Sequence, residues 1–178
     1  VMALLGKPSG GSRCIAVIPS TYRLLMRVLG EEIAQYDEKA AGFWDSAIRG
    51  SSALRAHLLR ALHVESAEAM HESVAVVLRD LRKFYDSIRI DKLVIELQAT
   101  GYPMGLATLG FIMHKAPRVL KAGPCLSNII EDPGRSVLAG CQQSVSWSRG
   151  LLYRLIEAIT LAVPRAITGT HVDDLAQV

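Results

Sequence analysis

An uninterrupted apolar run near the middle of the chain places the strongest constraint on the fold. It reads Val74-Ala75-Val76-Val77-Leu78 and ends at Arg79-Asp80. β-Branched residues favour strands, and a short continuous apolar run is typical of a strand that is buried on both faces. We therefore expect a central strand of a sheet here, with the carboxylate of Asp80 at its end.

The sequence on both sides of this run is mainly helical in pattern. Leu25, Val28, Leu29 and Ile33 recur at helical spacing, which predicts one helix from about Ser20 to Tyr36. Other helices are expected after the capping residues 51–52, over 87–99, 103–115 and 142–162, and as a short piece between Gly42 and Gly50. Residues 1–12 are expected to form a loop, residues 14–18 a strand and residues 117–139 a hairpin region. This mixture indicates an α+β fold.

Composition narrows the class of protein. A chain of 178 residues, half of them hydrophobic, forms about one packed domain, and its net charge of +3 allows a nucleic-acid partner. The cysteines Cys14, Cys125 and Cys141 are too widely spaced for a zinc site and suggest an intracellular protein, nuclear or cytoplasmic. The most apolar late stretch, 151–163, contains Arg154 and Glu157, so no membrane contact is expected.

A pair of adjacent carboxylates near the end of the chain is the first candidate for chemistry. Asp173-Asp174 follow the apolar run 166–172, a pattern that predicts a strand entering a tight turn. Most Asp-Asp dipeptides are solvated turn residues. Converging carboxylates nevertheless suit hard divalent cations, and Asp80 supplies a second acidic strand end.

Three segments together resemble the catalytic motifs of reverse transcriptases, closest to those of retrotransposons without long terminal repeats and of group II introns. The segment from Asp80 through Tyr85 to Ile88 resembles motif A. The segment 171–175 resembles motif C, with His171 in place of the usual aromatic residue. Between them, residues 135–144 resemble the glycine turn of motif B, with Ala139 and Gln142 departing from the usual pattern.

Two upstream segments extend the resemblance. Residues 13–19, which begin with Arg13, are similar to a fingers motif of this family, and residues 49–53 are similar to the next one. The resemblance implies part of a right-hand polymerase: a fingers-like region at 1–73 and a palm-like region at 74–178 with a small antiparallel sheet packed on helices. It also implies a fragment that ends before the thumb and is inactive by itself.

The resemblance assigns roles to individual residues. Asp80, Asp173 and Asp174 would be catalytic and, with the backbone carbonyl of Leu81, would bind two Mg²⁺ (or Mn²⁺) ions. The nucleotide-binding residues would be Tyr85 as the steric gate against ribonucleotides, together with Lys7, Arg13, Gly140 and Gln142. The implied partners are an RNA template, a DNA primer or target, and deoxynucleoside triphosphates.

Two alternatives remain open at this point. The substitutions Ala139, Gln142 and His171 are compatible with a degenerate, inactive retroelement remnant. A helical nucleic-acid-binding or interaction domain is the other alternative, in which the acidic turn is incidental. Trp44 and Trp147 are expected in the core, and the histidines at 57, 63, 71 and 114 are expected at or near the surface.

Overall fold

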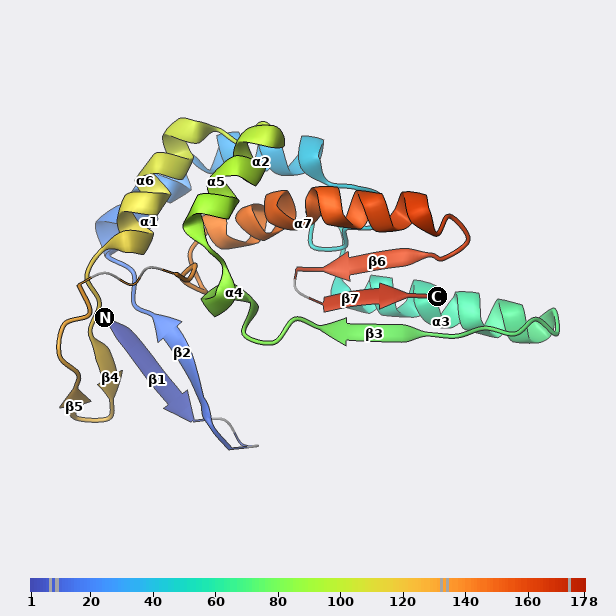
Figure 1. The fold of residues 1–178 in the computed structure, drawn as a ribbon, viewed down its shortest axis with the longest axis horizontal. Coiled ribbons are helices and arrows are strands. Elements are labelled where there is room, and N and C mark those ends of the chain that lie inside the picture. Colours follow the sequence, from blue (N-terminus) through green and yellow to red (C-terminus); the bar gives the residue numbers. More distant parts are fainter. Residues whose placement is uncertain (7, 9, 132, 134, 173) are drawn as a thin grey trace.

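A computed structural model describes residues 1–6, 8, 10–131, 133, 135–172 and 174–178 (Figure 1). It has a mixed α+β architecture, so the predicted fold class is confirmed. The elements, in chain order, are β1 Met2–Gly6, β2 Ser12–Ala16, α1 Ser20–Val28, α2 Gly30–Ala40, α3 Ala53–Ala69, β3 Val77–Asp80, α4 Phe84–Ser87, α5 Ile90–Ala99, α6 Met104–Lys115, β4 Leu120–Ala122, β5 Cys125–Leu126, α7 Gln143–Ala162, β6 Thr168–His171 and β7 Asp174–Gln177.

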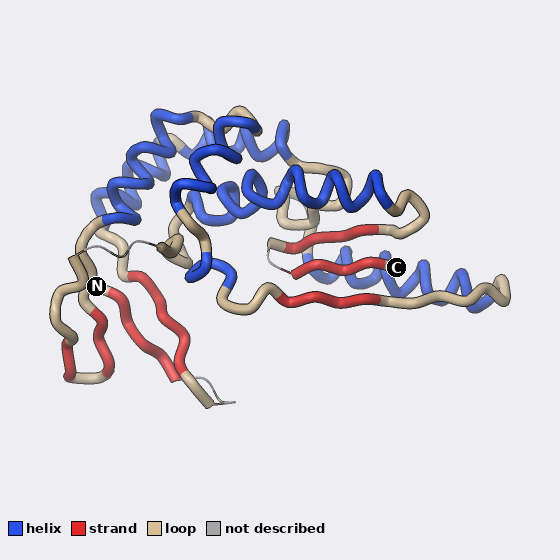
Figure 2. Tube along the Cα trace, viewed as in Figure 1, coloured by secondary structure: helices blue, strands red, loops and turns tan. Residues whose placement is uncertain are grey.

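The strands form two small sheets that lie apart from each other, with helices above them (Figure 2). In the first sheet the order is β2-β1-β4-β5, and only the β1–β4 pair is parallel. In the second sheet the order is β3-β7-β6, and both pairs are antiparallel. The second sheet carries the acidic strand ends, and α7 runs alongside its β6 strand (Figure 1).

The N-terminal residues 1–12 do not form the expected loop. Met2–Gly6 is strand β1, which pairs with β2 in a register that joins Met2 to Ala16 and Gly6 to Ser12. The turn is possible because Gly10 and Gly11 have φ values of +87° and +78°, a region that side-chain-bearing residues avoid. Gly10 and Gly11 thus belong to the turn of a hairpin whose first strand is the apolar run before them.

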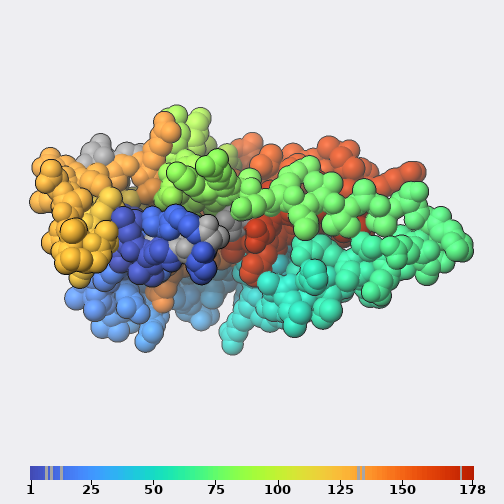
Figure 3. Space-filling model, turned by 90° about the horizontal axis from the view of Figure 1, so that it is seen from below, coloured from blue at the N-terminus to red at the C-terminus, as the bar shows by residue number. Residues whose placement is uncertain are grey.

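A strand forms at the end of the apolar run, but the prediction that it is buried and central was wrong. The strand covers Val77–Asp80 and forms one edge of the second sheet, paired only with β7 among the described residues. All four of its residues are exposed, and Leu78 is 70% exposed. Helix α3, which lies nearby in Figures 1 and 3, has no buried residue and does not cover this strand. A continuous apolar run therefore predicts a strand here but not its burial.

Most of the expected helices are present. Helices α5, α6 and α7 agree closely with the predicted ranges, and the Ser52 hydroxyl caps α3 by accepting from Arg55 N at 3.1 Å. The single helix expected over 20–36 is two helices, because the chain breaks at Leu29 before Gly30, a poor helix former. The piece between Gly42 and Gly50 is not helical. None of the described helices combines the length and apolar character needed to cross a membrane.

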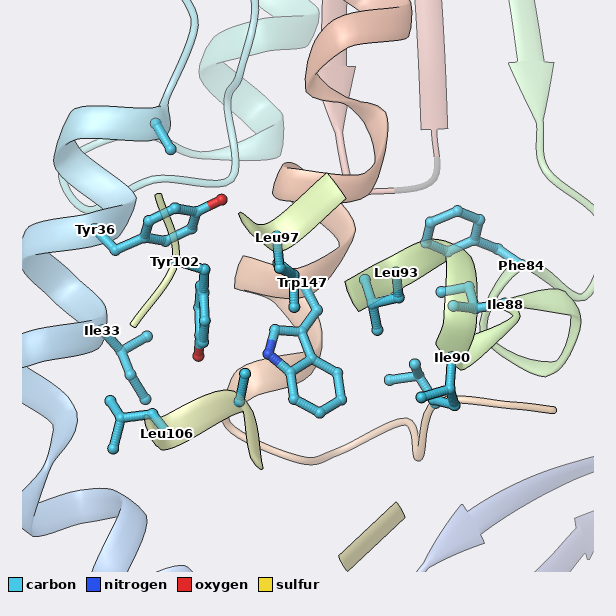
Figure 4. Packing of buried hydrophobic residues seen from close by; sticks show 13 residues of the cluster. Ile33, Tyr36, Phe84, Ile88, Ile90, Leu93, Leu97, Tyr102, Leu106 and Trp147 are labelled. Atoms are coloured by element: carbon cyan, nitrogen blue, oxygen red, sulfur yellow. The ribbon is translucent and has the colours of Figure 1, made fainter. Parts of the chain in front are cut away.

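The core lies where α2, α5, α6 and α7 meet, around Trp147 (Figure 4). Trp147 is fully buried, as predicted, whereas Trp44 is half-buried. Leu93 and Leu97 of α5 are also fully buried beside it. A Cβ at Gly110 of α6 would lie 2.5 Å from the Trp147 ring, so only glycine allows this close approach between α6 and α7.

His114 was expected near the surface but is only 1% exposed. Its Nδ1 accepts a hydrogen bond from Leu138 N at 2.9 Å, and its ring lies 4.7 Å from that of Trp147, centroid to centroid. Burial lowers the pKa of His114 to about 3, helped by the positive charge of Arg118. The histidine is therefore a neutral core residue of the folded protein.

This burial predicts a pH dependence of stability. In the unfolded chain His114 has the ordinary pKa of about 6.5, so below that pH the unfolded state binds a proton that the folded state does not. The stabilisation that comes from keeping His114 neutral is complete above pH 6.5. The free energy of unfolding should fall as the pH falls from there toward 3, by up to about 1.4 kcal/mol per pH unit. Denaturant titrations of the wild type and of His114→Gln at several pH values measure this. Identical pH dependence in the two proteins would contradict it.

Candidate active site

The acidic end of the chain forms a tight hairpin between β6 and β7. His171 pairs with Asp174, and Val172 lies in the turn that joins the two strands. Val172 has a φ of 60°, the left-handed conformation that two-residue hairpin turns require. Asp173 lies outside the described residues. The strand and turn expected from the sequence pattern at 166–174 are therefore present, with Asp174 as the first residue of the returning strand.

The two described carboxylates face each other across neighbouring strands. β3 pairs with β7 in a register that places Asp80 opposite Asp174. Directly paired residues of antiparallel strands have Cα atoms about 4.5–5.5 Å apart and side chains on the same face. Both aspartates are exposed, and neither side chain forms a hydrogen bond or ion pair with another described residue. Two like charges in such a pair destabilise the sheet unless a cation lies between them.

A non-helical segment, Trp44 to Ala47, lies against the other edge of the hairpin. Ser46 N donates to Thr170 O at 2.9 Å, and Thr170 N donates to Trp44 O at 2.8 Å. The Ser46 hydroxyl also donates to Thr170 O at 2.7 Å and lies 3.1 Å from His171 Nδ1. Sequence reasoning expected a short helix in this segment and missed its contact with the hairpin, because the partners are far apart in the chain.

Arg149 of α7 holds this segment in place. Its guanidinium donates to the carboxylates of Asp45 and Asp37 and, at 2.8 Å, to the carbonyl of Ala47. Burial by itself would lower the pKa of Arg149, but the Asp45 hydrogen bond and the charges of both aspartates outweigh burial and raise it. Arg149 therefore stays charged and connects α2, α7 and the segment beside the hairpin.

Tyr85, the predicted steric gate, is half-buried and packs against the core. Its carbonyl accepts from Val137 N at 2.8 Å, and the Ile88 carbonyl accepts from Ser136 N at 3.0 Å. The segment after Asp80 is thus joined to the one before Gly140. The carbonyl of Leu81 accepts from Phe84 N at 3.1 Å, which leaves one of its lone pairs for another ligand.

Gly140 and Gln142 lie together on the wall of a cavity of about 320 Å³. Gly140 has a φ of +95°, consistent with the predicted glycine turn. Gln142 is exposed, whereas Gln143 is buried and its amide donates to Tyr22 Oη at 3.0 Å. The opposite wall is helix α1, which contributes Arg23 and Arg27. Sequence reasoning missed these two cations, although their spacing places them on one face of a helix.

The structure thus places Asp80 opposite Asp174 on neighbouring strands, and it places Gly140 and Gln142 on the wall of one cavity. Lys7, Asp173 and the side chain of Arg13 lie outside the described part of the chain; the Arg13 backbone pairs with Leu5 in the β1–β2 hairpin. Within that described part, no cluster of three or more acidic, histidine or cysteine side chains is arranged to hold a metal ion. No protein-family model and no curated protein matches the chain.

Proposed function

We propose that this chain carries the nucleotidyl-transfer site of an RNA-directed DNA polymerase. The observation that supports it most is the pairing of Asp80 with Asp174 on adjacent antiparallel strands, at the end of the β6–β7 hairpin. Such an acidic pair, without a cationic partner among the described residues, costs stability. Its position also agrees with the order of motifs in the sequence. In a metal-dependent reaction the pair would hold the cation, a role that a purely structural pair of carboxylates would not have.

The described residues are a suitable donor set for Mg²⁺ or Mn²⁺. Magnesium is usually held by one or two carboxylates, with water and substrate phosphates completing its shell. The side chains of Asp80 and Asp174 are exposed and have no described hydrogen-bond or ion-pair partner, and Asp173 precedes Asp174 in the sequence. These carboxylates, with the Leu81 carbonyl, would hold the cations. When bound, the cations would activate the primer hydroxyl and neutralise charge on the leaving pyrophosphate.

The remaining residues would bind and orient the substrates. Tyr85 is fixed by its packing and its backbone bond to Val137, so its ring would limit the space available at the sugar of an incoming deoxynucleotide. Lys7 and Arg13 would bind the triphosphate. Arg23 and Arg27 would contact phosphates of the RNA template or DNA primer in the cavity beside Gly140.

A second candidate function is nucleic-acid binding without catalysis, by a degenerate polymerase or an unrelated helical domain. It is favoured by a second cavity, of about 340 Å³, whose lining includes Arg49, Arg55 and Arg60. Arginine-lined surfaces bind phosphate backbones without requiring a metal.

The deciding experiment is primer extension on an RNA template with deoxynucleotides and Mg²⁺, using the chain alone and a longer protein that contains it. Because the chain by itself is expected to be inactive, we expect extension by the longer protein, which stops when the cation is chelated and is absent from a matched Asp174→Asn preparation. Binding of the template-primer without extension by the longer wild-type protein would instead support the second candidate. Extension that survives Asp174→Asn would refute the assigned site.

A further inference from the structure

The hydroxyl of Ser46 determines which nitrogen of His171 carries a proton. Ser46 has a single hydroxyl proton, and its Oγ lies 2.7 Å from the Thr170 carbonyl, which can only accept. The hydroxyl proton is therefore committed to Thr170. The same Oγ lies 3.1 Å from His171 Nδ1, where it can then only accept a hydrogen bond. In the neutral form of its ring, His171 must therefore donate this bond from Nδ1–H and carry the lone pair on Nε2.

His114 provides an internal contrast. Its Nδ1 accepts from Leu138 N at 2.9 Å, so Nδ1 has no proton and the neutral ring carries its proton on Nε2. The structure thus predicts opposite tautomers for two histidines of the same protein. One of them, His171, is the residue that replaces the usual aromatic in the motif C resemblance.

The contact is held rigidly. Ser46 is buried, and its backbone N–H and side-chain O–H both donate to the Thr170 carbonyl. The next residue, Ala47, donates from N to Asp45 Oδ1 at 2.8 Å, and Arg149 holds both Asp45 and the Ala47 carbonyl. A side chain fixed on both sides in this way places its hydroxyl without a large loss of entropy when it bonds His171.

We propose that Ser46 is a positioning residue of the candidate site, which clamps the end of β6 and turns the proton of His171 away from the carboxylate row. His171 pairs with Asp174, which pairs with Asp80, so the three side chains share one face of the sheet. With its proton directed at Ser46, the neutral ring has no N–H to donate to these carboxylates. They stay available to a divalent cation; this last step rests on the proposed function.

The tautomer itself is tested without any enzymatic activity. Long-range ¹H–¹⁵N correlation spectra of the histidine rings, recorded well above pH 6.5, distinguish Nδ1–H from Nε2–H; the His171 signal is assigned by its loss in His171→Asn. We expect the Nδ1–H form for His171 and the Nε2–H form for His114. In Ser46→Ala the His171 form should shift toward Nε2–H, and in Ser46→Thr, which keeps a hydroxyl, it should not. An Nε2–H form of His171 in the wild type, or an unchanged spectrum in Ser46→Ala, would overturn the proposal.

The consequence for the site is tested by cation dependence. Losing a hydrogen-bond partner of a metal ligand typically costs about 10- to 100-fold in metal affinity. Ser46 acts one step further away, through His171, so the lower end of that range applies. We expect Ser46→Ala to raise the half-saturating Mn²⁺ concentration, measured by paramagnetic broadening of β7 amide signals, about 10-fold, and Ser46→Thr to restore it. An unchanged midpoint in Ser46→Ala would refute the effect on the cation. If the tautomers are as expected but no protein extends a primer, the positioning role of Ser46 is supported and the proposed polymerase activity is refuted.

Discussion

Replacing Arg149 with methionine is expected to lower the free energy of unfolding by about 3–5 kcal/mol, the cost of removing one partner from a buried ion pair. The side chain of Arg149 is only 4% exposed, and that of Asp45 is 7% exposed. Methionine fills a similar volume, so the loss comes mainly from the charge left behind on Asp45. That carboxylate would keep only the hydrogen bond from Ala47 N.

The measurement is urea unfolding of matched variants on the same helix. Arg154 also lies on α7 and pairs with Glu96 at 3.7 Å, but its side chain is 64% exposed. Arg154→Met should therefore cost less than about 1 kcal/mol, as is usual for exposed pairs. Adding Asp45→Asn to Arg149→Met should recover part of the loss, because it removes the stranded charge. Equal losses for the two arginine variants would contradict this account.

The segments that sequence reasoning placed well are those whose signals are local. Pro103 opens α6, Ser52 caps α3, and Gly101, with φ of +76°, ends α5. The hairpin at residues 168–177 follows equally from an apolar run and a turn. In each case the information lies within a few residues, so one sequence is enough to read it.

The predictions that were wrong share a different cause: these structures depend on partners that are distant in the sequence. Residues 44–47 are non-helical and bond to Thr170, and β1 is a strand because it pairs with β2 and β4. The burial of His114 depends on Trp147 and Leu138, and the exposure of β3 on its position at a sheet edge. None of these contacts can be read from the local pattern of the sequence.

The candidate site divides in the same way. The resemblance to polymerase motifs suggested Asp80, Asp174, Gly140 and Gln142 as site residues, and the fold adds the register that sets Asp80 opposite Asp174. The residues that support the site, Ser46 and Arg149, were not identified from the sequence. Their roles come from a serine hydroxyl and an arginine fork that reach elements more than one hundred residues away, at Thr170 and at Asp45 respectively.

Replacing Asp80 with asparagine is expected to reduce metal-dependent primer extension by at least about 100-fold, at the upper end of what even indirect ligand changes cost. Asparagine has nearly the same shape, and Asp80 is exposed at the end of an edge strand without a described partner, so the fold should not change. Removing one of two paired like charges should, if anything, relieve repulsion with Asp174. Loss of activity without loss of stability would thus identify a functional carboxylate.

The matched control is Asp91→Asn. Asp91 is also exposed, but it lies in the first turn of α5 and forms an ion pair with Arg89, the residue just before that helix. Its replacement should leave primer extension and the Mn²⁺ midpoint unchanged. Thermal unfolding of both variants separates a catalytic from a structural defect. If Asp80→Asn retained extension within about threefold of the wild type, the carboxylate row would not be the reaction centre, since a directly coordinating charge cannot be lost at so small a cost.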